Sequence, residues 1–433
     1  MGPRIPRIER ALAAARRNEY GSWIAVNEQA GSQYRRRSTA AGDGRTLDGM
    51  PCGVKDNIDV AGLPTASGSG MPPALPATDA EAVKRLKRAG AVIIGKNAMH
   101  EIAYGATGVV SAGDVVQNPR AIDRMPGGSS SGSAAAIAAG DVPFSIGTDT
   151  GGSVRVPASL CGVVGLRPTT GSLDSSGVKP LSPSLDTIGV LAGTVELIST
   201  VWTALNGGRQ WRSPNVDGSL RIGIIVDEHF GLAGQVPQPV LGLAAALFGD
   251  SGCTVSPVRL GWLDAASCVY ANIVGAEAAW VHRERMAEAP HTFQPATLQR
   301  LLSGARIPGW KYVEALRRRD RMREQMLRNF DNHDVLICPT TPITAPLRDE
   351  LTITVARKRI DVGAMLIKHT VPWSLVGTPS LALPLGRDAR GLPTSIQIVG
   401  KPGDEYNVLK AAAIVESMSA VPLRNCRLGS FGR

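Results

Sequence analysis

Two glycine- and serine-rich segments carry the most information in this chain: GSSSGSAAA at residues 128–136 and GTDTGGSVR at residues 147–155. Each holds a serine in a turn, and Lys55 lies upstream in the segment GVKDN. A serine hydroxyl is a poor nucleophile at neutral pH and needs a base to remove its proton. Serines are abundant here, whereas a Ser/His/Asp set is hard to assemble. We therefore single out Ser129, Ser153 and Lys55 as candidate site residues.

The segments around these turns alternate between helix and strand signals. Thr78 and Glu81 have the spacing of a capping box, which predicts a helix that stops at Gly90 before a buried strand over 91–94. An alanine-rich helix is predicted for the residues from Ser133 to Ala139, ended by Gly140, with a strand over 142–146 behind it. Such alternation is typical of α/β folds.

The remainder of the chain continues this pattern. Helices are predicted over 7–30, 156–160, 237–248 and 405–418, and strands over 221–226, 253–258, 335–339, 380–383 and 395–399, the last two as a hairpin. Residues 265–330 are helical and charged, which predicts an outer lobe on one side of the core. Since there is no repeat and no low-complexity linker, we expect one domain over residues 1–433.

Composition narrows the function classes. The 433 residues are 43% hydrophobic and carry a formal net charge of +10, with ten lysines and 37 arginines. A nucleic-acid surface would interleave basic groups with stacking aromatics, yet aromatic residues make up only 4%. No apolar run approaches the ~18 residues of a membrane span, and no secretory signal opens the chain. We expect a cytoplasmic protein with no nucleic-acid or membrane partner.

The six cysteines show no CxxC pair and no zinc-ligand spacing with histidine, so we expect reduced thiols and no metal. Cys52 stands apart, because it lies three residues before Lys55. Its place makes it a candidate for lining the same pocket.

Two segments match generic catalytic or phosphate-binding motifs but lack the sequence context that those motifs require. GAVIIGK at residues 90–96 begins like a phosphate-binding loop, but Asn97 replaces the required Ser or Thr and the intervening residues are strand-forming. GSSSG at residues 128–132 fits the nucleophile elbow of α/β-hydrolases, but a loop precedes it where a strand is required. A histidine base remains the second enzyme hypothesis, which a His→Ala series would test.

The turn at residues 150–153 suits the stabilisation of an oxyanion. Its two glycines leave the backbone free to turn the N–H groups of Thr150, Gly151, Gly152 and Ser153 toward one point. Taken alone, the same residues fit an ordinary glycine-rich connection between a strand and a helix equally well.

The chain resembles the amidase signature family, most densely over residues 48–192. Beyond 112–155, the resemblance rests on residues 48–65, 95–105, 161–169, 180–186, 338–342, 376–379 and 391–397. It departs from the family at Gly95-Lys96-Asn97-Ala98 and at residues 192–197, and the chain is somewhat short. The resemblance implies one large mixed, twisted β-sheet flanked on both sides by helices, without metal or organic cofactor.

Carried over by position, the resemblance makes Ser153 the nucleophile, Ser129 the bridging serine and Lys55 the base, with a cis peptide at Gly128–Ser129. Lysine acts as a base only when neutral, so its pKa must fall well below ~10.4, and burial near Val54 and Ile58 would lower it.

Three further residues are expected to support this site: Asp149, Arg155 and Ser130. Arg155 either holds the turn through an ion pair with Asp149 or contacts an acidic substrate group, and we favour the first role.

The sequence thus indicates an amidase that cleaves the C–N bond of a small-molecule amide. Three alternatives stay open: a glutamine-hydrolysing subunit of an amidotransferase, an amide-forming acyl transferase and a non-catalytic scaffold. Against the first, residues 171–177 lack the Arg-Tyr-Gly element usual in those subunits. Selectivity is expected from parts of 100–125, 265–315 and 340–375, and a homodimer is left open.

Overall fold

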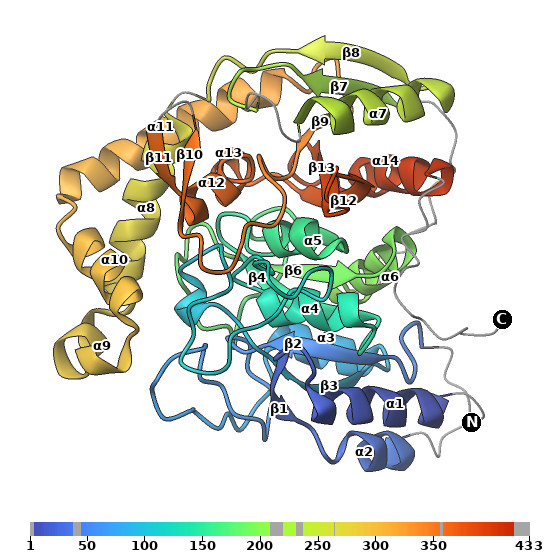
Figure 1. Cartoon of the computed structure of the whole chain (residues 1–433), viewed down its shortest axis with the longest axis vertical. Coiled ribbons are helices and arrows are strands. Elements are labelled where there is room, and N and C mark those ends of the chain that lie inside the picture. Colours follow the sequence, from blue (N-terminus) through green and yellow to red (C-terminus); the bar gives the residue numbers. More distant parts are fainter. Residues whose placement is uncertain are drawn as a thin grey trace.

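The computed structural model describes residues 4–37, 45–207, 220–230, 237–263, 265–355 and 358–419. Its centre is an 11-stranded mixed sheet in the order β1-β3-β2-β4-β6-β5-β12-β13-β9-β7-β8 (Figure 1). These strands are β1 (Trp23–Val26), β2 (Pro51–Lys55), β3 (Val92–Asn97), β4 (Phe144–Asp149), β5 (Val164–Arg167), β6 (Thr187–Ala192), β7 (Arg221–Ile225), β8 (Thr254–Val258), β9 (Val335–Pro339), β12 (Ser380–Arg387) and β13 (Pro393–Gly400). The predicted α/β class with a large mixed sheet is confirmed.

Two parallel groups of strands flank an antiparallel middle, and the edge strand β1 pairs antiparallel with β3. β2 pairs parallel with both β3 and β4, and β7 pairs parallel with both β8 and β9. Between them, β12 and β13 form the predicted hairpin, with Leu381 opposite Ile398 and Leu383 opposite Ile396. A small separate hairpin joins β10 (Thr352–Val355) to β11 (Lys358–Asp361).

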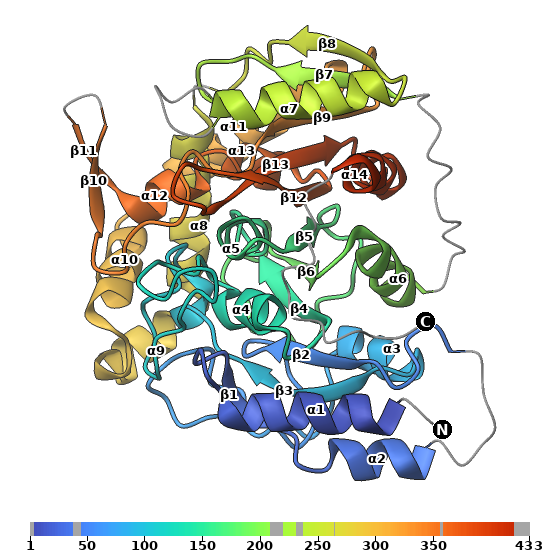
Figure 2. The same ribbon diagram turned by 45° about the vertical axis from the view of Figure 1, so that its right-hand side comes forward.

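Helices cover both faces of the sheet (Figure 2). One group shares an apolar core with the sheet: α3 (Glu81–Arg88), α6 (Val195–Leu205), α7 (Pro237–Asp250) and α14 (Glu405–Met418). The opposite face is packed by α1 (Arg4–Arg17), α2 (Ala30–Arg37), α4 (Ser131–Ala139) and α5 (Arg155–Cys161). Neighbouring residues of β3 belong to different cores, Ile93 to the first and Ile94 to the second, as the alternation of strand side chains requires.

The charged region after residue 265 folds into helices at one side of the sheet, at the left of Figure 1. They are α8 (Ala266–Val281), α9 (Arg283–Glu288), α10 (Pro295–Ala305) and α11 (Gly309–Arg328). Two short helices, α12 (Val362–Ile367) and α13 (Val371–Val376), lie beside them, and single 3₁₀ turns occupy Glu101–Ala103 and Pro290–Thr292. No helix in the described ranges is long and apolar enough to cross a bilayer.

The predicted helix over residues 7–30 is wrong beyond Arg17. Asn18 takes a φ of 47° and Gly21 a φ of 65°, and both values lie in the left-handed region that ends a right-handed helix. The chain then reverses into β1, where Trp23 pairs with Asn97 of β3. Trp23 also donates its indole N–H to Asp141 Oδ2 at 2.9 Å.

The predicted capping box at Thr78 and Glu81 is also wrong. Ala80 is the N-cap of α3, without a side-chain cap, and Glu81 is already the first helical residue. The Glu81 carboxylate pairs forward with Arg85 at 3.3 Å, while Asp79 accepts from the backbone N–H of Ala61. The Glu81 carboxylate, which the box would turn back to the N-cap backbone, is therefore engaged by Arg85.

Candidate active site

Lys55 ends β2 in the middle of the molecule and is fully buried. Because β2 lies parallel to β4 with Val54 opposite Ile146, the lysine side chain reaches the end of β4. Its Nζ lies 2.7 Å from Ser129 Oγ, 2.8 Å from Thr148 Oγ1 and 3.3 Å from the Thr148 carbonyl. Burial lowers the pKa of Lys55 to about 7, although Asp149 and Asp186 act in the opposite direction.

Three oxygens therefore surround the Lys55 amine. Two belong to Thr148, its hydroxyl and its carbonyl, and the third is the Ser129 hydroxyl, which can accept a hydrogen bond from an ammonium group or donate one to a neutral amine. Asn57 Nδ2 also donates to Thr148 Oγ1 at 3.2 Å, which holds that hydroxyl in place. Sequence reasoning missed Thr148, since only the pairing of β2 with β4 brings it to Lys55.

Ser129 and Ser153 lie in two turns that are tied together. Ser129 precedes α4, its peptide bond with Gly128 is cis as the family resemblance implies, and its carbonyl accepts from the N–H of His100 at 3.0 Å. The next residue, Ser130, donates its backbone N–H to the Ser153 carbonyl at 3.1 Å. Its hydroxyl donates to the Thr148 carbonyl at 3.3 Å. Ser130 therefore connects the two turns and the end of β4.

Asp149 organises the turn that carries Ser153. Its carboxylate accepts from the N–H of Gly152 at 2.8 Å and from that of Val154 at 3.2 Å. Burial would raise the pKa of Asp149, but the guanidinium groups of Arg155 and Arg167 bring it below its ordinary value. The residue is therefore an anion that holds the turn from inside.

Arg155 forms an ion pair with the Asp149 carboxylate and does not line the cavity described below. Its Nε and Nη2 lie 3.0 and 2.9 Å from the two Asp149 oxygens. Its remaining donors are used by Gln397 Oε1 and Ser374 Oγ, each at 2.6 Å, and by the Thr370 carbonyl at 3.1 Å. Since the side chain is fully buried, these contacts favour the expected role of holding the turn.

The expected oxyanion donors fall into two groups. Gly152, with a φ of 138°, gives its N–H to Asp149, so this amide is already used. For the N–H groups of Thr150, Gly151 and Ser153, no acceptor is found within the described ranges. The Thr150 hydroxyl donates to Asp186 Oδ1 at 2.5 Å, which fixes the first residue of the turn. The turn thus offers three amides rather than four.

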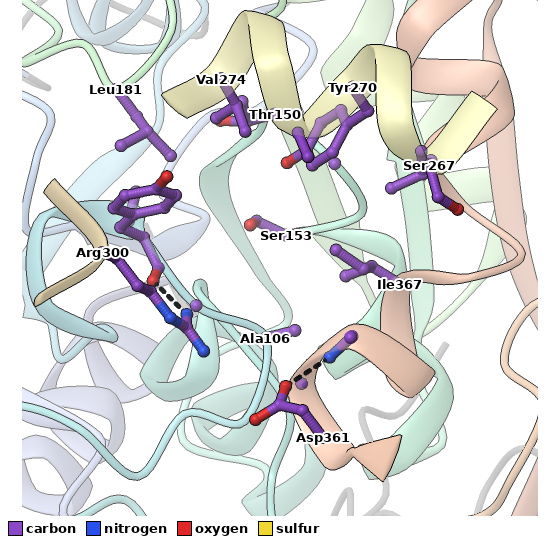
Figure 3. A pocket seen from close by; sticks show the side chains of 18 of the residues that line it. Ala106, Thr150, Ser153, Leu181, Ser267, Tyr270, Val274, Arg300, Asp361 and Ile367 are labelled. Atoms are coloured by element: carbon purple, nitrogen blue, oxygen red, sulfur yellow. Dashed lines mark hydrogen bonds between the residues drawn. The ribbon is translucent and has the colours of Figure 1, made fainter. Parts of the chain in front are cut away.

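Ser153 opens onto a cavity of about 370 Å³ (Figure 3). The lining residues are Ala103, Tyr104, Gly105, Ala106, Thr150, Gly151, Ser153, Leu181, Ser267, Tyr270, Ala271, Val274, Arg300, Asp361, Gly363, Ala364, Ile367, Lys368 and Val371. Most of them come from the three segments expected to set selectivity. Lys55 and Ser129 do not line the cavity, so among the three expected catalytic residues Ser153 is the one that faces it.

Cys52, a candidate for the pocket wall, does not line this pocket. Its side chain lies in the apolar core shared with α3 and α6, where burial raises the pKa of the thiol. Side chains alternate along a strand, and Cys52 and Lys55, three positions apart on β2, therefore point to opposite faces. Cys426 lies outside the described residues.

No cluster of three or more His, Cys, Asp or Glu side chains suited to a metal ion occurs in the described part of the chain.

Comparison with known proteins identifies the family of this chain. The family model described as Amidase matches residues 10–409. The chain is 35% identical over 396 residues to 1-carboxybiuret hydrolase subunit AtzE of Pseudomonas sp. (strain ADP), covering 87% of this chain and 86% of that protein. It is 32% identical to a Glutamyl-tRNA(Gln) amidotransferase subunit of Methanosarcina mazei (strain ATCC BAA-159 / DSM 3647 / Goe1 / Go1 / JCM 11833 / OCM 88), covering 94% and 92%.

A solved structure described as an amidase superposes with a TM-score of 0.87 at 32% identity, with 96% of each chain covered. The structure of 6-aminohexanoate cyclic dimer hydrolase superposes with a TM-score of 0.84 at 25% identity, covering 96% of this chain and 93% of that one. The family match, which spans nearly the whole chain, and the hydrolases among these relatives lead to one conclusion: this chain belongs to the amidase signature family and is an amide-hydrolysing enzyme.

Proposed function

We propose that this enzyme hydrolyses a small-molecule amide through an acyl-enzyme on Ser153, with protons passed through Ser129 to Lys55. The observation that carries the proposal is the 2.7 Å contact between Lys55 Nζ and Ser129 Oγ in a fully buried setting. It supplies a base whose pKa lies near neutrality. The neighbouring turn presents Ser153 to a cavity large enough for a small ligand.

In the first half of the reaction, neutral Lys55 accepts the proton of Ser129, and Ser129 accepts the proton of Ser153. The Ser153 oxygen then attacks the amide carbonyl carbon, and the carbonyl oxygen becomes an anion. The N–H groups of Thr150, Gly151 and Ser153 are the donors proposed to stabilise it. Donors held in place before the reaction stabilise such a charge without reorganisation.

In the second half, the relay runs backwards. Lys55 returns its proton through Ser129 to the departing amine, because a neutral amine leaves where an amide anion does not. Water then attacks the ester on Ser153, and the same relay takes its proton and restores the free hydroxyl. Each step uses an amine near its pKa, which suits both acceptance and return of a proton.

Labelling of Ser153 tests the proposal. A fluorophosphonate should label the wild-type protein and fail to label Ser153→Ala, and amide hydrolysis should be lost in the same variant. Ser131→Ala is the matched control, because Ser131 is a buried serine of the neighbouring segment whose hydroxyl has no partner in the described structure. Equal labelling of Ser153→Ala and wild type would overturn the assignment.

Glutamine hydrolysis within an amidotransferase is a second candidate, since one component of such an enzyme is among the relatives. The segment 171–177, which lacks the Arg-Tyr-Gly element, argues against it. Ammonia release from glutamine by the isolated chain, compared with release from simple amides, separates the two. Adding hydroxylamine to the same assay and measuring hydroxamate reports transfer of the acyl group to an amine.

A further inference from the structure

Two tryptophans on the helical side of the molecule are exposed. Trp280 of α8 is 60% exposed and Trp310, near the start of α11, is 64% exposed, whereas the other four tryptophans that the structure describes are at most 4% exposed. Both belong to the helices at the left of Figure 1. Tryptophan is enriched at the energetic centres of protein interfaces, so this face is a candidate contact surface.

A groove of about 570 Å³ lies beside these rings. Its walls include Pro183, Ala276, Trp280, Ile307 and Tyr312. Among the described residues that line it, Glu277 is the one that carries a charge. The Glu277 carboxylate already accepts three hydrogen bonds, at 2.6, 2.9 and 3.1 Å, from neighbouring donors. The groove therefore offers a mainly apolar and aromatic wall.

Trp310 projects at the edge of this groove, because Gly309, the residue before it, lines the groove. A projecting ring next to a groove is self-complementary. A two-fold axis that crosses midway between the two features carries the ring of each copy into the groove of the other. There the indole would meet Trp280 and Tyr312, and aromatic pairs stabilise a contact beyond the area that they bury.

Charges of both signs surround the ring and the groove. On the groove side, Arg283 lies over the Trp280 ring and pairs with Glu284 at 2.7 Å. On the side of the projecting ring, Lys311 and Glu314 present a cation and a carboxylate. The same two-fold axis sets the groove side of one copy against the ring side of the other, so Glu284 can face Lys311 and Arg283 can face Glu314. Such exposed pairs add little affinity but favour one orientation.

The apolar area suffices for a specific contact. An aromatic side chain buries roughly 150–250 Å², so the four tryptophans of two copies, each about 60% exposed, supply on the order of 500 Å². The surfaces that they cover lose a similar area, which brings the total to about 1,000 Å², the lower limit for a specific interface. Val313, 50% exposed and one turn beyond Trp310, adds to it.

We propose that this face joins two copies of the chain, with Trp310 of each copy seated in the groove between Trp280 and Tyr312 of the other. An unrelated partner would need the groove alone. The projecting ring beside the groove, with both signs of charge around each, is the arrangement that a second copy requires. The contact lies outside the chemistry at Ser153 and does not depend on it.

Sedimentation velocity of the purified chain between about 1 and 100 µM tests the pairing. We expect a species of twice the 45.4 kDa of one chain to predominate at the upper concentration. Trp310→Glu should raise the Kd for pairing at least about 100-fold, because a tryptophan at an interface centre carries more than tenfold and a two-fold contact loses it twice. Ile122→Glu is the matched control: this apolar residue is 63% exposed, lies outside the groove and should leave the Kd unchanged.

A second variant tests the exchange of rings between copies. Ala276→Arg places a cation in the groove and should also prevent pairing. An equal mixture of Ala276→Arg and Trp310→Glu should pair again, because the remaining Trp310 finds the unaltered groove and the new carboxylate meets the new arginine. Circular dichroism melts check that each variant is folded, which we expect since Trp310 is exposed and Ala276 lines an open groove.

A wild type that sediments as a monomer over the whole range would overturn the pairing and leave the groove to a different protein. A dimer that Trp310→Glu does not weaken would use another surface and would overturn it as well. Failure of the two folded variants to pair in the mixture would reject the seating of Trp310 in the groove. Since no readout here measures amide hydrolysis, each result is independent of the proposed function.

Discussion

Lys55 is an amine removed from water, and its proton affinity follows from that burial. The pKa is lowered from 10.5 to about 7 because the ammonium form loses its hydration. Only the neutral form accepts a proton from Ser129, so we expect kcat/KM to rise with pH through an apparent pKa near 7 and to level off above it. Measurement of kcat/KM between about pH 5 and 10 checks this. A profile that rises only near 10.5 would show an ordinary, hydrated lysine.

Replacement of this lysine separates its chemistry from its packing. Lys55→Met keeps a long unbranched side chain without the base, so we expect activity to fall at least about 10³-fold. We expect the free energy of unfolding at pH 8 to change by less than ~1.5 kcal/mol, since the volume is nearly conserved. Between pH 7 and 10.5 the unfolded wild type binds a proton at this residue that the folded protein does not, so wild-type stability gains from rising pH.

Circular dichroism melts of both proteins across this range should show a weaker pH dependence for Lys55→Met. The amidase assay and the melts must agree for the interpretation to hold. A variant that unfolds while losing activity would reveal a structural role for the amine, and undiminished turnover would remove Lys55 from the relay.

The turn from residue 149 to residue 155 depends on one buried ion pair. Arg155→Met would leave the Asp149 carboxylate with Arg167 as its one ion-pair partner among the described residues, and breaking a buried pair costs about 3–5 kcal/mol. We expect that loss in urea unfolding, together with a fall in kcat because the turn carries Ser153. Arg155→Lys should recover part of the stability. Wild-type stability combined with a raised KM for acidic substrates alone would instead assign Arg155 to substrate binding.

The same turn requires glycine at position 151 because α8 approaches it closely. A methyl group on Gly151 would lie 2.2 Å from Tyr270 Oη, so Gly151→Ala must displace either the turn or the tyrosine. We expect kcat/KM to fall by about 10²-fold, the cost of a displacement near 1 Å at a reacting group. The penalty should be smaller in a Tyr270→Ala background. Gly193→Ala, where an added methyl meets nothing within 4 Å, is the control.

The sequence predicts the elements whose signals are local. α4 is ended by Gly140 with a φ of 83°, and the β12–β13 hairpin has strands with apolar runs on either side of a turn. β2 was not predicted, because Pro51, Gly53 and Lys55 give it no strand pattern, although every one of its residues is buried. β1 was wrongly predicted as part of a helix for a similar reason, because a strand of four residues is too short to show a period in its sequence.

The candidate site divides in the same way. Ser129, Ser153 and Lys55 could be named because they stand in motifs that resemble a family. Arg300 and Lys368 stand in no such motif. Thr148 stands in one, but its contact with Lys55 depends on the pairing of β2 with β4, which the motif does not reveal. A residue that acts through tertiary contact leaves no local pattern, so the sequence could not name the residues of the cavity wall.

At the scale of the whole molecule, α8 connects the helices at one side of the structure to the sheet. It carries Tyr270 and Val274 of the cavity wall and packs against α10 and α11. Glu277, one turn beyond Val274, is buried, and both of its carboxylate oxygens accept hydrogen bonds. It accepts from the Ser182 hydroxyl at 2.6 Å and the Ser184 N–H at 3.1 Å, and from the Tyr312 hydroxyl of α11 at 2.9 Å. One carboxylate thus joins the sheet side to two helices.

Loss of this carboxylate should loosen the cavity wall without touching the relay. Glu277→Gln replaces an acceptor with an amide N–H₂ that faces donors, so we expect a loss of about 1–3 kcal/mol in stability. Hydrogen exchange should quicken in α8 and α11 and stay unchanged in α4, with KM rising more than kcat falls because α8 forms the wall and not the nucleophile. Glu284→Gln, an exposed position on α9 whose one ion pair in the described part of the chain is with Arg283, is the control. Exchange in α8 that matches this control would show that the wall is held by apolar packing alone.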